Sequence, residues 1–225
     1  MPQSPLLLAI DTSTDVAGVA VRGDGAAVSL SWNAGRNQTT AVLDQVDRCL
    51  GLAGAGPADL GGIVVATGPG MFNGLRVGMS LAKGLAYGLD RPIIGISTLR
   101  VTADPWIGLD RPVIAVVAAG RGRIVWQRFS TDGVAGREPV NAQAGDLLEL
   151  VGSEPGVIVA GEVPDELGPA LNERGAWLRS GLSGRRDPLA LARLGAERLA
   201  RMGADDLVTL EPQYIHSRPA AVAGA

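Results

Sequence analysis

The sequence has few of the side chains that most catalytic and metal sites use. Among its 225 residues are one cysteine (Cys49), one histidine (His216) and one lysine (Lys83). A single cysteine excludes an intramolecular disulfide and is typical of a reducing cytosol. Several cysteines or histidines would be needed for a zinc site of such ligands, and nothing near His216 would fix it in a Ser-His-Asp triad. The composition therefore argues against these chemistries.

Charge of either sign is also scarce. Lysine and arginine total 20 residues and aspartate and glutamate total 23, which leaves a net charge of −3. A free-standing nucleic-acid-binding protein usually has a basic face, which this balance does not favour. The first residues, MPQSPLLLAI, have no positive segment, and their apolar run is too short for a signal peptide or a membrane span. We expect a soluble cytoplasmic protein.

Hydrophobic residues make up 46% of the chain and gather in short runs. Such runs, separated by turn residues, are typical of buried strands. We predict strands at Leu6–Ile10, Val16–Val21, Ala26–Trp32, Ile63–Ala66 and Ile93–Ile96. A helix capped by Thr39 or Thr40 is predicted from the helical spacing of Val42, Leu43, Val46, Leu50 and Ala53, and Asn73 is expected to cap a second, glycine-bearing helix.

A second copy of this pattern begins near residue 112. The segment RPVIAVVAAGRGRIVWQRF is again strand, turn and strand, and it repeats the N-terminus at an offset of roughly 107 residues. This offset places Ala118 opposite Asp11. A helix near Ala144–Val151, a strand at Val157–Ala160 and a helix after Pro164 are expected to follow.

The last predicted helix has clear boundaries. Asp187 is expected as its N-cap, Pro188 at its first position and Gly203 just beyond its end. Its inward residues are predicted to be Leu191, Leu194, Leu199 and Met202. Two copies of the same pattern indicate two α/β lobes with mixed sheets, at residues 1–103 and 104–217, followed by a tail at 218–225.

The most unusual segment is ATGPGMFNGLRVGMSLAKGLAYGL, Ala66–Leu89, with six glycines. A glycine loop between a strand and a helix can hold a phosphate. However, a P-loop has Lys-Ser or Lys-Thr after its last glycine, whereas Gly74 is followed by Leu75 and Arg76. The spacing of Gly68, Gly70 and Gly74 is also one residue too wide for a dinucleotide fingerprint. The phosphate interpretation is therefore disfavoured.

The helix in this segment is polar along one narrow stripe only, formed by Arg76, Ser80, Lys83 and Tyr87. Its glycines form pairs four residues apart, Gly74/Gly78 and Gly84/Gly88. Each interior glycine costs about 0.8–1 kcal/mol relative to alanine, which close packing against another helix would offset. The sequence leaves open whether that second helix belongs to this chain or to a partner.

Acidic residues occur around the first turn, at Asp11 and Asp15. A carboxylate there could hold a hydrated Mg²⁺ near phosphates, but an Asx-type turn or cap is the favoured interpretation. The equivalent turn of the second copy reads Ala118, Ala119 and Gly120, with no acid. A paired acidic cleft is therefore not expected. Cys49 lies at a helical position beside Leu50 and is interpreted as a small core residue.

Three segments together resemble the TsaB (YeaZ) family: LLAIDTSTDVAGVAV, TGPGMFNGLRVGMSLAKGLA and GISTLRVTA. A weaker likeness continues from VIVAGE to LEPQYIHSR. The resemblance covers most of the chain and is specific in the first 100 residues. It implies a two-lobed actin/Hsp70-like (ASKHA) α/β fold with duplicated mixed-sheet units and a degenerate nucleotide site, in which Asp11, Thr12 and Ser13 would be a vestigial nucleotide loop.

The resemblance also implies a function. Members of this family are non-catalytic partners of TsaD and act with TsaE and TsaC. The system forms threonylcarbamoyladenosine beside the anticodon of ANN-decoding tRNAs from threonine, bicarbonate and ATP. The chain would then have no cofactor of its own, ATP or ADP only at the partner interface, indirect contact with tRNA, and a surface that can also form a homodimer. The implied interface consists of Val42, Val46, Cys49, Leu50, Gly74, Arg76, Gly78, Met79, Ala82, Lys83 and Ala86.

The chain departs from the family pattern at several positions. Met71 and Asn73 replace a serine and a threonine in GPGSFTGLR, and the second turn reads Ala118, Ala119, Gly120 where Asp-Ala-Arg is common. His216 stands where an arginine is usual. Two alternative functions remain. An ATP-dependent small-molecule kinase would use Asp11, but DTST lacks the glycine that lets the backbone approach phosphate. A peptidase would need a nucleophile and base, or a metal site, that this sequence does not supply.

Overall fold

The computed structural model describes residues 5–23, 25–34 and 38–215, and they form two compact α/β units. Unit 1 comprises residues 1–101 and 186–213, and unit 2 comprises residues 102–185 and the chain from residue 214. The expected boundary after residue 103 lies within two residues of the observed one. The expectation that residues 104–217 form one lobe is wrong for 186–213, because the apolar face of the last helix packs on the sheet of unit 1.

The sheet of unit 1 is mixed and five-stranded, in the order β3-β2-β1-β4-β5. β1 is antiparallel to β2 and parallel to β4, while β2–β3 is antiparallel and β4–β5 is parallel. The predicted strands are confirmed. Their bounds are β1 Leu6–Asp11, β2 Val16–Gly23, β3 Ala26–Asn33, β4 Leu60–Gly68 and β5 Ile93–Ser97.

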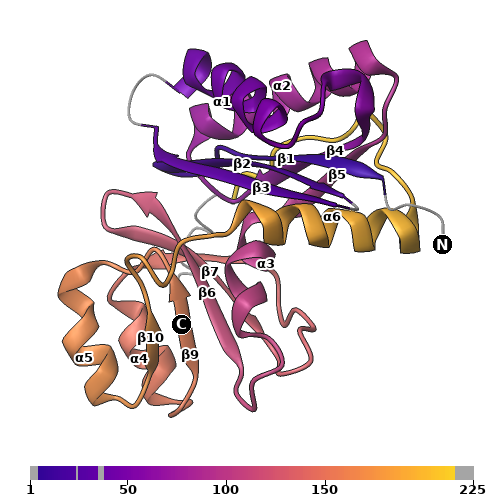
Figure 1. Ribbon diagram of the computed structural model, residues 1–225. Helices are drawn as coiled ribbons and strands as arrows, with labels where there is room; N and C mark the ends of the chain where they lie inside the picture. The colour runs from indigo at the N-terminus through magenta and orange to yellow at the C-terminus, as the bar shows by residue number, and fades with distance from the viewer. Residues whose placement is uncertain (1–4, 24, 35–37, 216–225) are drawn as a thin grey trace. The chain divides into compact units, whose positions relative to one another are not determined.

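Helices cover both faces of this sheet (Figure 1). α1 (Gln38–Leu52) and α2 (Phe72–Leu89) lie on one face, and α6 (Pro188–Met202) lies on the other. Alternate residues of β1 point to opposite faces. Leu8 and Ile10 accordingly pack with α1 and α2, whereas Leu7 and Ala9 pack with α6. The unit therefore has two cores that share one sheet.

The ends of α6 follow the sequence prediction. Asp187 is the N-cap, and its Oδ1 accepts a hydrogen bond of 2.9 Å from the backbone N–H of Leu189. Gly203 ends the helix with a φ of 80°, in the left-handed region. Of the residues expected to face inward, Leu191 and Leu194 are buried but Met202 is 76% exposed. The prediction for Met202 is wrong: Met202 is the last residue of α6, and its side chain lies largely in solvent.

Two helical glycines of unit 1 have opposite surroundings. A Cβ added to Gly195 of α6 would lie 2.4 Å from Cγ2 of Val64 on β4, whereas a Cβ on Gly84 of α2 would meet nothing within 4 Å. We expect Gly195→Ala to lower the free energy of unfolding by about 1–3 kcal/mol through overpacking. Gly84→Ala should raise it by about 0.8–1 kcal/mol through helix propensity. Chemical denaturation of both variants measures these opposite changes in the free energy of unfolding. Equal changes in the two variants would contradict the prediction.

The chain after α6 returns along the open edge of β5. Asp205 forms an antiparallel bridge with Ile93, and its Oδ2 accepts a hydrogen bond of 2.7 Å from the backbone N–H of Gly95. Arg198 of α6 forms a bidentate ion pair with the same carboxylate. Burial would raise the pKa of Asp205, but the hydrogen bonds from Arg198 and Gly95 and the Arg198 charge together hold this pKa below its usual value. The ionised carboxylate therefore links Arg198 of α6 to the backbone of β5.

The lowered pKa of Asp205 predicts a loss of stability in acid. A carboxylate with a depressed folded-state pKa contributes stability above its unfolded pKa, near 4, and loses it as the pH falls through the folded value. We expect Asp205→Asn to lower the free energy of unfolding at pH 7, and the difference from wild type to shrink below about pH 4. Urea melts across this pH range measure it. A difference that is constant with pH would show that the charge is not responsible.

Unit 2 repeats the sheet of unit 1 in the order β10-β9-β6-β7-β8, with β6 antiparallel to β7 and parallel to β9. β6 begins at Val113, so the predicted repeat and its offset from Leu6 are confirmed. Strands β8 and β10 and the short helix α3 were not predicted. The bounds are β6 Val113–Gly120, β7 Arg123–Phe129, β8 Val140–Gln143, β9 Ile158–Gly161, β10 Trp177–Arg179, α3 Thr98–Ala103, α4 Asp146–Gly152 and α5 Gly168–Glu173.

Three short 3-10 helices complete the secondary structure of the described residues, η1 Pro57–Asp59, η2 Asp104–Trp106 and η3 Asp165–Leu167. Helices α4 and α5 pack with β6 and β9 around a third core that contains Ile114, Val116, Leu147 and Leu171. None of the helices in the described part of the chain is both long and apolar enough to cross a membrane.

Candidate functional site

The turn between β1 and β2 begins with a buried carboxylate. Asp11 is 3% exposed, and its Oδ1 accepts hydrogen bonds from the backbone N–H of Ser13, at 2.9 Å, and from the Ser13 hydroxyl. A side-chain oxygen bonded to the backbone two residues on is an Asx turn. The favoured interpretation of Asp11 from the sequence is therefore confirmed.

The other oxygen of Asp11 is held by Arg186. Nε of Arg186 donates to Asp11 Oδ2 at 2.7 Å, and Nη2 donates to Thr14 Oγ1 at 2.5 Å. The side chains of Asp11 and Arg186 are each 5% exposed. Arg186 is the residue before the N-cap of α6, and it belongs to unit 1. The negative charge that would attract Mg²⁺ to this turn is therefore already paired inside the chain.

The glycine segment closes on this same turn. A Cβ on Gly70 would lie 2.2 Å from the backbone oxygen of Ser13, and the N–H of Met71 donates to that oxygen at 2.6 Å. Thr12 Oγ1 donates to the backbone oxygen of Gly74 at 2.7 Å, and a Cβ on Gly78 would lie 2.3 Å from Thr12 Oγ1. Gly70 and Gly78 thus let the loop and α2 approach the β1–β2 turn. The idea that the Gly74/Gly78 notch faces another helix is wrong.

Most of the residues implied as a partner interface are inside unit 1. Of the eleven, nine are buried: Val42, Val46, Cys49, Leu50, Gly74, Gly78, Met79, Ala82 and Ala86. They face the sheet or the neighbouring helix, so they are corrected from interface to core. Lys83 is half-buried, and its Nζ donates to the backbone oxygen of Val208 at 3.1 Å. Arg76 alone among the eleven is well exposed.

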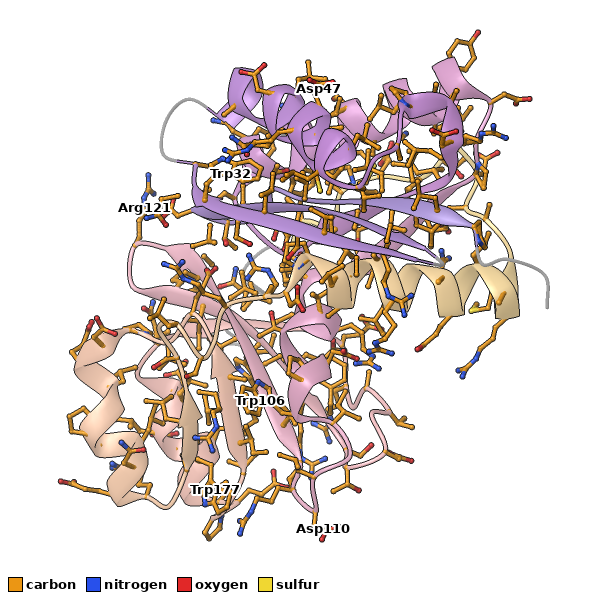
Figure 2. All side chains as sticks on the ribbon, viewed as in Figure 1. Trp32, Asp47, Trp106, Asp110, Arg121 and Trp177 are labelled. Atoms are coloured by element: carbon orange, nitrogen blue, oxygen red, sulfur yellow. The ribbon has the colours of Figure 1, made fainter. Side chains whose placement is uncertain are left out.

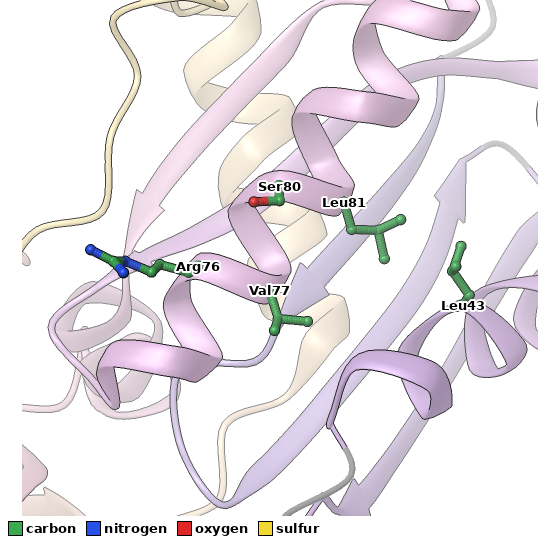
Figure 3. Close-up of a pocket in the computed structure, with 5 residues that line it drawn as sticks. All are labelled: Leu43, Arg76, Val77, Ser80 and Leu81. Atoms are coloured by element: carbon green, nitrogen blue, oxygen red, sulfur yellow. The ribbon is translucent and has the colours of Figure 1, made fainter.

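The outer surfaces of α1 and α2 form a docking groove, which we define by Leu43, Arg76, Val77, Ser80 and Leu81 (Figure 3). It has a volume of about 440 Å³ and is mainly apolar. Leu43, from α1, is 53% exposed, although helical spacing grouped it with inward residues. The guanidinium of Arg76 lies 3.7 Å from the ring centre of Phe72, itself 51% exposed. Exposed apolar side chains beside a concave surface favour a binding partner.

Other candidate residues have simple structural roles. Burial raises the pKa of the Cys49 thiol, which disfavours the reactive thiolate. Asn73 lies inside the first turn of α2 and is not its cap, because the helix begins at Phe72 after Met71. Within residues 5–23, 25–34 and 38–215, no group of three His, Cys, Asp or Glu side chains could hold a metal ion. His216 and the tail at 218–225 lie outside the described residues.

The equivalent turn of unit 2 is open. Ala118 and Ala119 are exposed, and the backbone N–H of Ala118 donates to Oε2 of Glu162 at 3.1 Å. Glu162 follows β9, so an acid does reach this turn from a part of the sequence that local reasoning did not connect with it. The carboxylate at the first turn is therefore Asp11 of β1 in unit 1, and Glu162, which follows β9, in unit 2.

Comparisons with known proteins find a transferase family model and relatives named for tRNA threonylcarbamoyladenosine biosynthesis. The profile of the family described as "TsaD: tRNA N6-adenosine threonylcarbamoyltransferase" matches residues 32–156, more than half of the chain. The "tRNA threonylcarbamoyladenosine biosynthesis protein TsaB" of Escherichia coli is 35% identical over 129 residues, covering 56% of this chain and 55% of that protein. The protein of the same name from Haemophilus influenzae is 32% identical over 149 residues, covering 65% of this chain and 61% of that protein.

The fold is also similar to a solved structure. A Pseudomonas aeruginosa protein, described as uncharacterized with similarity to peptidase YeaZ, aligns with a TM-score of 0.78 and 24% identity. The alignment covers 94% of this chain and all of that one. At this identity the likeness shows the fold alone, over the aligned part of the chain. The sequence matches reach little more than half the length of the curated relatives.

Proposed function

Since the chain belongs to the TsaB (YeaZ) family of tRNA threonylcarbamoyladenosine biosynthesis proteins, we propose that it is a non-catalytic partner of the transferase TsaD. In this role it binds TsaD and supports formation of threonylcarbamoyladenosine next to the anticodon of ANN-decoding tRNAs. TsaE is a further component of the same complex. The work of such a complex is cytoplasmic.

The docking groove carries this proposal. It is a concave, mainly apolar surface on α1 and α2 of unit 1, with one exposed arginine at its edge. Interfaces of this kind bind through a few apolar anchors surrounded by polar residues. The same surface can pair two copies of the chain when TsaD is absent.

The surroundings of Asp11 support a role without catalysis. A kinase of the same superfamily would need this carboxylate free to act near phosphates, whereas Arg186 and Ser13 occupy both of its oxygens. We therefore propose that the chain has no nucleotide of its own, and that any ATP or ADP is held where it meets its partner. Calorimetry of the isolated chain with ATP and Mg²⁺ should detect no micromolar binding.

Reconstitution tests the function as a whole. Purified TsaC, TsaD and TsaE are incubated with an ANN-decoding tRNA transcript, threonine, bicarbonate and ATP, with and without this chain. We expect modified adenosine only when the chain is present. Equal product without the chain would overturn the role in modification. Product without TsaD would instead make the chain the catalyst and overturn the non-catalytic part.

A further inference from the structure

Unit 2 has a row of alternating aromatic and cationic side chains that the proposed function does not use. We call it the Trp–Arg row, and it runs Trp106, Arg179, Trp177, Arg111. The guanidinium carbon of Arg179 lies 5.2 Å from the Trp106 ring centre and 5.8 Å from that of Trp177. That of Arg111 lies 4.0 Å from the Trp177 ring centre. Each arginine is within the range of cation–π attraction.

The sheet places Trp177 and Arg111 of this row at the amino ends of the parallel strands β10 and β6. Trp177 is opposite Ile158, which is opposite Val113, and Arg111 precedes Val113 by two residues. Trp177 and Arg179 point to one face of β10 because they are two residues apart. Leu178 between them packs on the core formed with α4 and α5. The row therefore lies on the other face of the sheet. It runs along the edge formed by β10, which is the last strand in the sheet order.

The backbone fixes the row in place. Nη1 of Arg111 donates to the backbone oxygen of Gly156 at 2.9 Å, and Nη1 of Arg179 donates to that of Leu178 at 2.9 Å. Gly156 has a φ of 86°, and a Cβ there would lie 2.6 Å from Nη1 of Arg111. Trp177 is nevertheless 45% exposed. An ordered indole that remains accessible suits recognition, because little entropy is lost on binding.

In the described part of the chain, neither Arg111 nor Arg179 forms an ion pair with a carboxylate. Arg128, Arg186, Arg193 and Arg198 each pair with a carboxylate. Across residues 5–23, 25–34 and 38–215, Arg111 and Arg179 contact backbone oxygens and indole rings but no carboxylate. A guanidinium has five N–H donors, and each of these two uses one in the bonds just described. Positive charge and free donors remain for an anionic ligand.

We propose that the Trp–Arg row binds a single-stranded segment of RNA. Unpaired bases stack on aromatic rings and on guanidinium planes, and the remaining guanidinium donors bind phosphate. A duplex offers no free base faces, whereas a single strand supplies bases for the indoles and phosphates for the arginines. The choice of RNA rests on the proposed function, in which tRNA is the substrate of the complex. The net charge of −3 does not oppose it, since the row is a local site.

Binding by the isolated full-length chain tests this proposal. The probe is a fluorescein-labelled anticodon stem–loop RNA with an ANN-decoding sequence, followed by fluorescence anisotropy over a series of low salt concentrations. We expect Trp177→Ala to weaken binding about 5- to 150-fold, the range for one lost base stack, with an unchanged salt dependence. Arg111→Ala should weaken binding and reduce the slope of log affinity against log salt by about 0.7.

Arg121→Ala is the matched control, because it removes the same charge from an exposed residue of the same unit. Arg121 lies at the β6–β7 hairpin, at the opposite end of β6 from Arg111 (Figure 2). We expect its affinity to stay within about twofold of wild type. Arg111→Lys keeps the charge without the planar stack, so it should preserve the slope and still weaken binding. This variant remains informative if Trp177→Ala fails to fold.

Three results would overturn the RNA proposal. The first is no binding by the wild-type chain at low salt, and the second is equal affinity of wild type and Arg111→Lys. The third is unchanged RNA affinity of Trp177→Ala together with lost co-purification with TsaD, which would make the row a protein-binding surface. Because the assay contains no other protein, its failure leaves the proposed function intact. A failed reconstitution would equally leave RNA binding by the row measurable.

Discussion

Replacing Leu43 with glutamate is expected to weaken binding to TsaD by at least about 30-fold and to lower tRNA modification in the reconstituted system. Leu43 lines the docking groove and is 53% exposed, so the isolated chain should fold normally. In the complex the new carboxylate would be buried against apolar groups without a partner, which is costly. Anchor residues at interfaces typically contribute about 2 kcal/mol or more, from which the expected loss follows.

Leu52→Glu provides the matched control. Leu52 lies on the same helix and is 60% exposed, but it does not line the groove. It should bind TsaD as wild type does, and both variants should have wild-type circular dichroism and similar unfolding transitions. Isothermal titration with TsaD measures the affinities. If Leu43→Glu binds as tightly as Leu52→Glu, the groove is not the docking surface and the partner uses another face of the chain.

Replacing Arg186 with alanine is expected to destabilise the fold strongly. It would leave the carboxylate of Asp11 buried without its cation, and breaking a buried pair from one side typically costs about 3–5 kcal/mol. For a chain of this size, 1 kcal/mol corresponds to about 2–4 °C in melting temperature, so a decrease of roughly 6–20 °C should follow. Thermal denaturation monitored by circular dichroism measures it.

Two further variants distinguish the stability lost with the buried ion pair from the stability lost by removing any arginine. Arg193→Ala breaks an ion pair with Glu197 on the surface of α6, where the side chains are 38% and 43% exposed, and it should cost less than about 1 kcal/mol. Adding Asp11→Asn to Arg186→Ala removes the uncompensated charge and should recover part of the lost stability. Equal costs for Arg186→Ala and Arg193→Ala would contradict the importance of the buried pair.

The sequence was sufficient to predict the strands of unit 1, the first strands of unit 2 and the duplication. Apolar runs such as LLLAI and VIAVV are long enough to indicate buried strands, and their common offset reveals the repeat. The caps of α6 were predictable because Asp187, Pro188 and Gly203 act through local backbone geometry. Strands β8 and β10 were missed because VNAQ and WLR, at four and three residues, are too short for a strand pattern to stand out. Pairing with β7 and β9 is what extends them.

The candidate site was less predictable, because it depends on contacts between distant residues. Asp11 and Arg186 are 175 positions apart, and no local pattern connects them. In α2, apolar side chains and glycines occupy most of the circumference. Spacing alone does not tell which side covers its own sheet. The interface implied by the family resemblance therefore included residues that are core in the structure, such as Met79 and Ala82. The polar stripe was informative, since Arg76 and Ser80 do line the groove.

Unit 1 is discontinuous in the chain, and this affects how the protein is made. Residues 1–101 emerge from the ribosome well before α6, which covers the face of β1 and β4 that bears Leu7 and Val64. At 5–20 residues per second the intervening synthesis takes roughly 5–20 s, during which that apolar face has no cover of its own. The nascent N-terminal segment is therefore expected to be a chaperone client until α6 has been synthesised. A ribosome stalled within unit 2 should yield an aggregation-prone product.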